Sequence, residues 1–325
     1  MPQPTLSQVH VDAILSNASI MYQQDDMDFA ATRVFPLLPV KKKSDLYFEY
    51  NKDDFFRDTF KRRAPGTESS GSGYGILQRS YVCEKWSLHH DIDDDTRADE
   101  DDPLDADLDA TSWLTTQALI SQEVQWALAY FTTGVWGQDI TTTGGGVIGT
   151  ANTVKWSDYT NSQPLVDINY WKKLVKLATG KLANVMVMSF DVFCALQNHP
   201  VLIDRIKYTS RDVVTEEIMA TYFGVDEVIV SSAIYNTAAE GQTASNAFIM
   251  ASGVLLCYRA PKPGIRTASA GYTFEWTGIS GGMGLTTAIK KYRMEHIDSD
   301  RIEATLSYVF KVVGAGLGVF SGTII

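Results

Sequence analysis

The sequence predicts an α+β fold, because a long helix, a mixed block of strands and helices, and a final run of strands follow one another along the chain. The longest helical pattern runs through residues 105–136, and no Pro or Gly interrupts it before Gly134. Residues 185–260 alternate short apolar strands with helices, and residues 271–325 show mostly the two-residue alternation of strands. The 325 residues, 45% of them hydrophobic and 21% charged, are enough to bury a core without disulfides or metals.

Charge and cysteine content narrow the classes of function. The net charge of -11 disfavours a nucleic-acid-binding surface, which needs clustered Lys and Arg. Cys83, Cys194 and Cys257 are far apart and form no CxxC motif, which predicts reduced and mostly buried thiols. The N-terminal segment lacks the basic start and long apolar core of a signal peptide, and no apolar run of about 18 residues predicts a transmembrane helix.

The first 90 residues predict two extended elements that need a surface to lie on. Residues 1–40 are expected to form an extended arm, because Pro36 and Pro39 force an extended path. Residues 44–90 are expected to form one long β-hairpin with a flexible tip that is rich in Gly and Ser. Because a two-stranded ribbon is marginal in water, we expect it to rest either on its own domain or on a neighbouring subunit.

An acidic run follows at residues 91–109, and Arg97 is its only basic residue. Its spacing partly matches a calcium-binding loop, with carboxylates at Asp91, Asp93, Asp95, Asp99 and Asp102. The match fails where Thr96 replaces the required Gly and where an Asp replaces the usual bidentate Glu. The sequence therefore favours a solvated acidic loop that leads into the long helix.

The long helix itself is expected to span roughly 25 residues, or about 37 Å at 1.5 Å per residue. The carboxylates at its start favour the positive end of the helix dipole. A second apolar face carries Leu119, Trp126 and Tyr130. Its main apolar face, which recurs at steps of three and four, is predicted to contain Trp113, Gln117, Ile120, Val124, Ala127, Leu128 and Phe131.

Beyond the long helix, a helix is predicted from Pro164 to Gly180, since Pro favours a first helical turn and Gly a helix end. The apolar run from Val185 to Ser189 predicts a buried strand. Further helices are expected directly after this strand and from Thr215 to Gly224. Further strands are expected at residues 225–232, 248–260 and 271–325.

No constellation of residues predicts catalysis. The Gly- and Thr-rich segment 137–150 lacks the Lys of a phosphate-binding loop, and Ser189 lacks the flanking glycines of a nucleophile elbow. Adjacent His89 and His90 on a strand point to opposite faces and do not form a chelating pair. Structural or surface roles are therefore expected for all histidines: His10, His89, His90, His199 and His296.

The order of these elements and several short sequence segments resemble those of one protein family. The segments NSQPLVDI, TGKLANVMVMSFDVFCALQNHPVLIDRIKYT, FGVDEVIVSSAIYNTA and AGYTFEW are similar to patterns in the major capsid proteins of tailed double-stranded-DNA bacteriophages, the Hong Kong 97-type fold. The resemblance extends from about residue 30 to residue 325. It implies an N-terminal arm at 1–43, an extended β-hairpin loop at 44–90, a peripheral domain with a spine helix at 91–180, an axial domain at 181–268, and return strands of the peripheral domain at 269–325.

The same resemblance implies a structural, non-enzymatic function without a cofactor. Copies of the chain would assemble as pentamers and hexamers into an icosahedral shell that encloses the double-stranded DNA genome without sequence-specific binding. The expected location is the virion, and the host cytoplasm during assembly, with no membrane association. The other expected partners are a separate scaffolding protein, because the arm begins almost at Met1, a portal protein and a decoration protein.

Two further expectations concern contacts between subunits. Some family members crosslink a loop Lys to an Asn of a neighbour; Lys61 offers an amine here, but no Asn follows Asn246, so non-covalent assembly is expected. The basic residues Lys61, Arg62 and Arg63 are expected to pair with the acidic run of an adjacent copy, through the candidates Asp93, Asp94, Asp95, Asp101 and Asp102. The alternatives are the shell of an encapsulin-type bacterial nanocompartment and a metal-dependent enzyme that uses the acidic run.

Overall fold

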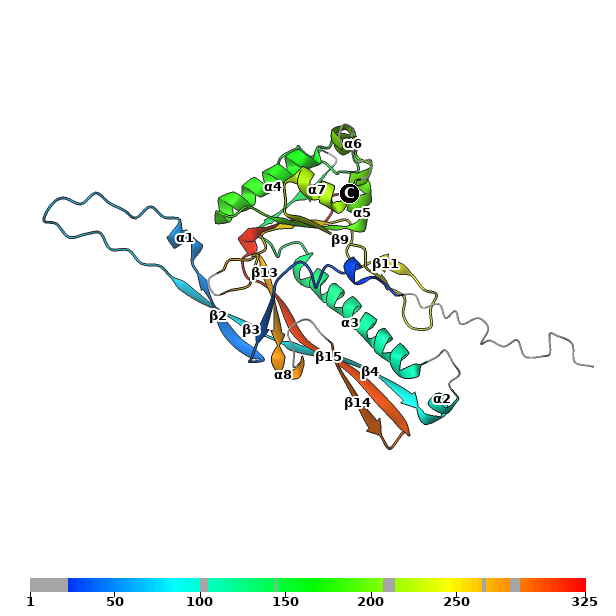
Figure 1. The fold of residues 1–325 in the computed structure, drawn as a ribbon. Coiled ribbons are helices and arrows are strands. Elements are labelled where there is room, and N and C mark those ends of the chain that lie inside the picture. The colour runs from blue at the N-terminus through cyan, green and yellow to red at the C-terminus, as the bar shows by residue number, and fades with distance from the viewer. Residues whose placement is uncertain (1–22, 100–104, 144, 207–213, 265–266, 281–286) are drawn as a thin grey trace, which may run out of the picture.

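A computed structural model describes residues 23–99, 105–143, 145–206, 214–264, 267–280 and 287–325 of the chain. Two sheets organise these residues, and a two-stranded ribbon projects away from both of them (Figure 1). We call the two sheets the long sheet and the compact sheet. Within the described residues, no helix is long and apolar enough to cross a membrane.

The long sheet is built around its longest strand, β15 (Ser299–Val312). One edge of β15 pairs with β4 along residues 299–308, whereas its other edge pairs first with β14 and then with β13. Strand β1 adds to β13 in parallel, so the N-terminal segment joins a sheet made mainly from the C-terminal third. The remaining strands are β1 (Leu37–Val40), β4 (Glu84–Asp93), β13 (Gly271–Trp276) and β14 (Ala288–Met294).

Helix α3 (Ala106–Tyr130) is the predicted long helix, and it lies along the long sheet (Figure 1). It begins at Asp105, whose side chain accepts hydrogen bonds from the N–H groups of residues 107 and 108, both at 3.1 Å. The predicted main apolar face is wrong: Trp113 is 44% exposed and Leu128 is 64% exposed. The second predicted face is confirmed in part, and the residues that α3 buries are Ala110, Leu114, Gln122, Glu123, Trp126 and Tyr130.

The prediction failed because the buried stripe of α3 contains two polar residues, Gln122 and Glu123. Hydrophobic periodicity assigns such positions to solvent and shifts the predicted face around the helix. The carboxylate of Glu123 is fully buried and accepts hydrogen bonds from the N–H groups of Ala30 (3.1 Å) and Ala31 (2.7 Å). It also accepts one from the hydroxyl of Ser231 (2.8 Å). Burial raises the pKa of Glu123, and these hydrogen bonds oppose that rise.

The compact sheet has the order β5-β16-β12-β8-β9, with helices packed against it (Figure 1). Every residue of the inner strand β8 is buried, as its apolar run predicts. The strands are β5 (Gln138–Asp139), β16 (Gly318–Ser321), β12 (Val254–Cys257), β8 (Val185–Ser189) and β9 (Glu227–Ser231). The helices are α4 (Pro164–Thr179), α5 (Phe190–Gln197), α6 (Pro200–Ile206) and α7 (Glu216–Phe223).

Helix α4 shows how the compact core forms. Pro164 occupies its first turn, and Gly180 ends it in a left-handed conformation with φ 72°. Its apolar face, with Ile168 and Val175, joins the compact core, and Trp171 stacks on Trp156 with ring centroids 5.5 Å apart. Both α4 and β16 therefore belong to the compact unit, although the expected boundaries at residues 180 and 269 assigned them to the peripheral domain.

The predicted hairpin also differs from the structure at its second strand. Strands β2 (Ser44–Tyr50) and β3 (Ile76–Val82) pair in antiparallel fashion and form the projecting ribbon. The next strand, β4, begins at Glu84 and belongs to the long sheet. Buried Cys83 separates β3 from β4, and its N–H donates to the carbonyl of Lys43 at 2.8 Å. The ribbon therefore ends at Val82 rather than at residue 90.

Short elements complete the described chain. They are η2 (Asp26–Asp28), α1 (Lys52–Phe55), α2 (Asp94–Ala98), β6 (Thr141–Thr142), β7 (Asn152–Thr153), β10 (Ile234–Asn236), β11 (Asn246–Phe248), α8 (Thr277–Ser280) and η3 (Ala315–Leu317).

The assignment of the buried face of α3 can be tested with two matched substitutions. Leu114→Ala removes a fully buried side chain and should lower the free energy of unfolding by about 2–5 kcal/mol. Leu128→Ala removes a side chain that is 64% exposed and should change it by less than about 0.5 kcal/mol. Urea unfolding of the two variants measures both values. Equal losses would mean that the helix is turned differently.

A second prediction concerns the buried carboxylate of Glu123. In Glu123→Gln an amide nitrogen replaces one acceptor oxygen, so at least one of the three donors loses its partner. We expect a loss of about 1–3 kcal/mol in the free energy of unfolding. Asp109→Asn makes the same chemical change at an exposed site on α3 and should cost less than about 0.5 kcal/mol. A Glu123→Gln protein as stable as wild type would refute the tie between α3 and the arm.

Candidate assembly surfaces

The ribbon of β2 and β3 has one face anchored and one face uncovered. On the anchored face, Tyr81 stacks on Phe274 of the long sheet with ring centroids 4.7 Å apart, and Tyr47 lies 5.8 Å from the same ring. The opposite face exposes apolar side chains that a two-stranded ribbon cannot bury. Contiguous apolar surface of this kind marks an interaction site. It consists of Leu46 (53% exposed), Phe48 (64%), Ile76 (48%) and Val82 (52%).

The tip of the ribbon carries both aromatic and basic side chains. Phe60 is 97% exposed and directly precedes Lys61, Arg62 and Arg63, which are also exposed. The Arg63 side chain donates to the carbonyl of Thr67 within the tip. No ion pair joins these three cations to a carboxylate of the described residues. The basic charges predicted to contact an adjacent copy are therefore available for one.

Three aspartates of the acidic run, Asp91, Asp94 and Asp107, are paired with cations of their own chain. Asp91 forms a two-pronged ion pair with Arg301 (2.6 and 2.7 Å), and Asp94 forms one with Arg293 (2.6 and 2.7 Å). These Arg partners lower the pKa of both carboxyl groups. At the start of α3, Asp107 bonds to Lys291 (2.6 Å). No group of three or more metal-ligating side chains occurs in the described part of the chain.

The ion pairs within the chain separate the aspartates predicted to contact a neighbour into those that are already paired and those that are not. Asp94 already has an intramolecular partner, whereas Asp93 and Asp95 form no ion pair with a described residue. Asp101 and Asp102 lie outside the described residues. The contact between the tip and an acidic neighbour stays a prediction, and Asp93 and Asp95 are the better candidates. Sequence alone could not separate them, because the pairing Arg residues come from distant strands β14 and β15.

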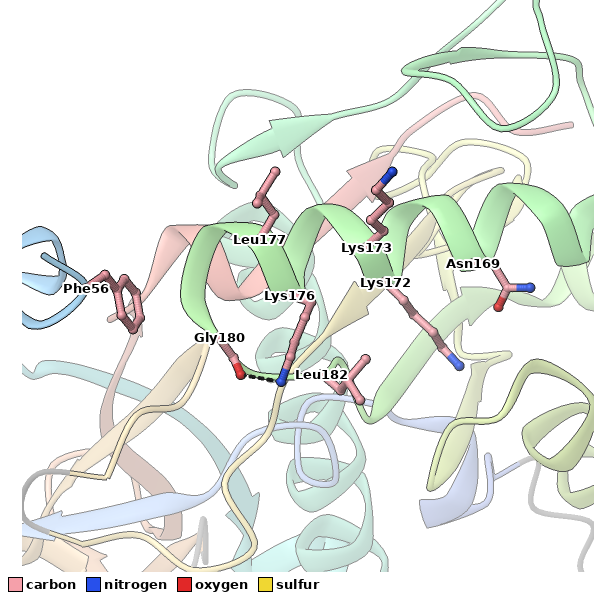
Figure 2. A pocket seen from close by; sticks show the side chains of 8 residues that line it. All are labelled: Phe56, Asn169, Lys172, Lys173, Lys176, Leu177, Gly180 and Leu182. Atoms are coloured by element: carbon pink, nitrogen blue, oxygen red, sulfur yellow. Dashed lines mark hydrogen bonds between the residues drawn. The ribbon is translucent and has the colours of Figure 1, made fainter. Parts of the chain in front are cut away.

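A hollow of about 670 Å³ lies over the C-terminal half of α4 and forms a second candidate surface (Figure 2). The ring of Phe56, which directly follows α1 beyond the end of β2, lies beyond the end of the helix. Lys172 donates to the carbonyl of Gly224 at 2.6 Å, and Lys176 donates to that of Gly180 at 2.7 Å. We call this surface the α4 hollow; it is lined by Phe56, Asn169, Lys172, Lys173, Lys176, Leu177, Gly180 and Leu182.

The side chains with catalytic potential are held in structural roles. His199 is fully buried, its Nε2 lies 2.9 Å from the Ser162 hydroxyl, and burial lowers its pKa. The cysteines are free thiols, and burial raises the pKa of Cys83 to about 11 and that of Cys257 to about 12. Thiols with such pKa values stay protonated and are poor nucleophiles. Ser189 is fully buried on β8, and His10 lies outside the described residues.

No family model matches the chain. Among curated proteins, it is similar to the major capsid protein of Burkholderia phage BcepMu, with 24% identity over 228 residues, which cover 69% of this chain and 70% of that protein. Among solved structures, it is similar to a phage-related protein from Bordetella bronchiseptica, with a TM-score of 0.67, 21% identity and 93% of each chain covered.

The fold recurs in shells of more than one kind. The capsid of cyanophage P-SCSP1u matches with a TM-score of 0.63 and 10% identity, over 99% of this chain and 95% of that chain. An encapsulin complex from Synechococcus elongatus matches with a TM-score of 0.56 and 12% identity, over 95% and 92%. The predicted resemblance is thus confirmed: the chain has the Hong Kong 97-type fold and is similar in sequence to a phage major capsid protein.

Proposed function

We propose that this chain is the major capsid protein of a tailed bacteriophage, and that its copies assemble as pentamers and hexamers into an icosahedral shell around double-stranded DNA. The observation that carries the proposal is the uncovered apolar face of the ribbon, with Leu46 and Phe48 more than half exposed. In a monomer this surface stays in water, whereas in a shell a neighbouring copy covers it. The fold and the sequence similarity to a phage capsid protein agree with this function.

Within such a shell, the two sheets would belong to different domains of the subunit. We assign the long sheet and α3 to the peripheral domain, and the compact sheet with its helices to the axial domain that meets at the five- and six-fold positions. Residues 44–82 correspond to the extended loop that overlies the next subunit. With these assignments the axial domain includes α4 and β16, and the N-terminal arm runs across both domains.

The proposed role is structural and non-enzymatic. The portal protein, a separate scaffolding protein and a decoration protein are the partners expected beside further copies of the chain. The net charge of -11 suits a wall that encloses DNA without gripping it. The protein would reside in the virion, and in the host cytoplasm during assembly. Its shell would be held by non-covalent contacts.

A second candidate function is the shell of an encapsulin-type nanocompartment, which the likeness to the Synechococcus elongatus encapsulin favours. The two functions differ in contents: one shell encloses DNA, the other encloses protein. The sequence similarity to a phage major capsid protein gives the phage function the stronger support.

Electron microscopy of the purified protein, alone and after co-expression with its neighbouring genes, tests these proposals. Closed shells that contain DNA are expected. Small shells that contain a protein cargo would favour the encapsulin function, and a protein that stays monomeric under both conditions would refute both. On a denaturing gel, purified particles should give a single band at the mass of one chain. A ladder of larger bands would contradict non-covalent assembly.

The basic tip provides a specific prediction. The double charge reversal Arg62→Glu/Arg63→Glu should reduce shell formation and leave the monomer folded, because both side chains are exposed and the change would place like charges against an acidic neighbour. Sedimentation velocity measures assembly, and circular dichroism measures folding. Lys262→Glu, a charge reversal at an exposed lysine outside residues 44–82, is the matched control. Normal assembly of the double variant would remove this contact but not the proposed shell.

A further inference from the structure

The α4 hollow combines positive charge with exposed apolar surface in a chain of net negative charge. Leu177 is 81% exposed and Leu182 is 57% exposed. The three lysines of the hollow form no ion pair with a described carboxylate. Lys172 and Lys176 are held against backbone carbonyls at the ends of α7 and α4, whereas Lys173 is exposed and has no hydrogen-bond partner among the described residues. Such a surface matches an acidic segment with an apolar side chain.

A negatively charged surface with an exposed apolar side chain lies within the arm, at residues 25–27. Asp25 and Asp26 are exposed and form no ion pair with a described cation, and Met27 beside them is 70% exposed. We call these three residues the acidic knob. It begins the short helix η2, where carboxylates favour the N-terminal turn.

The acidic knob is fixed in place by the residues on both sides of it. Gln24 exchanges two hydrogen bonds with the backbone of Ile234, at 2.8 and 2.9 Å. Asp28 accepts hydrogen bonds from both the hydroxyl and the N–H of Ser232. A surface that is already ordered loses little conformational entropy when it binds. The acidic knob therefore has the properties of a preformed contact rather than of a loose tail.

The two surfaces lie at different sides of the compact sheet. The acidic knob is bound to residues that directly follow the edge strand β9. The α4 hollow lies beside η3, which leads into β16, and strands β12 and β8 separate β16 from β9. Figure 1 shows the C-terminal end of α4 and η2 on opposite sides of the compact sheet. Two complementary patches at different places on one chain make a head-to-tail contact, which closes into a ring when the rotation between copies allows it.

We propose that the acidic knob of one copy seats in the α4 hollow of the next copy around each pentamer and hexamer. This inference rests on the proposed shell function and names the contact that links adjacent compact units. Asp25 and Asp26 would face the lysines of the α4 hollow, and Met27 would cover the exposed leucines. Because the contact is heterologous, every copy uses both surfaces, and a charge exchange within one chain preserves the pairing.

Charge exchange between Lys173 and Asp26 tests the proposal in the full-length protein, because neither side chain has a hydrogen bond or an ion pair with another described residue. Lys173→Glu and Asp26→Lys should each raise about tenfold the protein concentration at which half of the chains are assembled, because each places like charges together. The double variant Lys173→Glu/Asp26→Lys restores opposite charges and should return to within about twofold of wild type. Sedimentation velocity gives these values, and thermal unfolding of the monomers checks that all variants fold.

Lys262→Glu serves again as the matched control and should assemble like wild type. Rescue by the double variant supports the contact, since two unrelated defects would add rather than cancel. Single variants that assemble normally, or a double variant at least as defective as each single one, would overturn the contact and leave the shell function intact. Wild-type protein that forms neither rings nor shells would overturn the shell function and this contact together.

Discussion

The buried carboxylate of Glu123 is the constraint on which the arrangement of the molecule depends. It joins α3 of the long sheet, the arm at Ala30 and Ala31, and the end of β9 in the compact sheet through Ser231. A carboxylate buried without partners is strongly unfavourable, so its three donors are held together by the cost of losing any one of them. Glu227 repeats the connection nearby, since it pairs with Arg33 of the arm and with Arg259 after β12. These contacts fix the relative position of the two sheets together with a shared apolar core, in which Val187 and Leu255 of the compact sheet lie in one cluster with Tyr308 and Phe310 of the long sheet.

The sequence predicts the elements that follow simple patterns. The buried strand β8, helix α4 with its Pro start and Gly end, and the long helix α3 all occur where the residues place them. The predicted face of α3 is wrong because the buried stripe includes the polar residues Gln122 and Glu123, and the partners of Glu123 come from segments distant in sequence. The same cause hides which aspartates are paired, since the partners of Asp91 and Asp94 lie on β15 and β14. The local sequence pattern determines where helices and strands form. Partners that are distant in sequence determine which polar residues are buried.

The described residues leave exposed apolar side chains on the ribbon, at its tip and over α4. Cores of both sheets are dense with aromatic pairs, such as Trp156 with Trp171 and Phe35 with Tyr130. Exposed aromatic residues gather instead at the end of the ribbon, where Phe55, Phe56, Phe60 and Tyr74 are each more than half exposed. Exposed aromatic side chains gathered in one place are typical of a surface that binds a partner, which agrees with the proposed assembly.

The break between β3 and β4 has a mechanical consequence. Cys83 lies where the ribbon meets the long sheet. Its N–H donates a hydrogen bond to the carbonyl of Lys43, and its thiol lies 3.7 Å from the carbonyl of Phe274. On the N-terminal side of Cys83, the ribbon projects away from both sheets. On its C-terminal side, β4 pairs with ten residues of β15. A small rotation at Cys83 would swing the tip through a large arc, and it would have to shift the contacts of Tyr81 and Tyr47 with Phe274. In the proposed shell, such a rotation would let one sequence meet neighbours at the different angles of five-fold and six-fold rings.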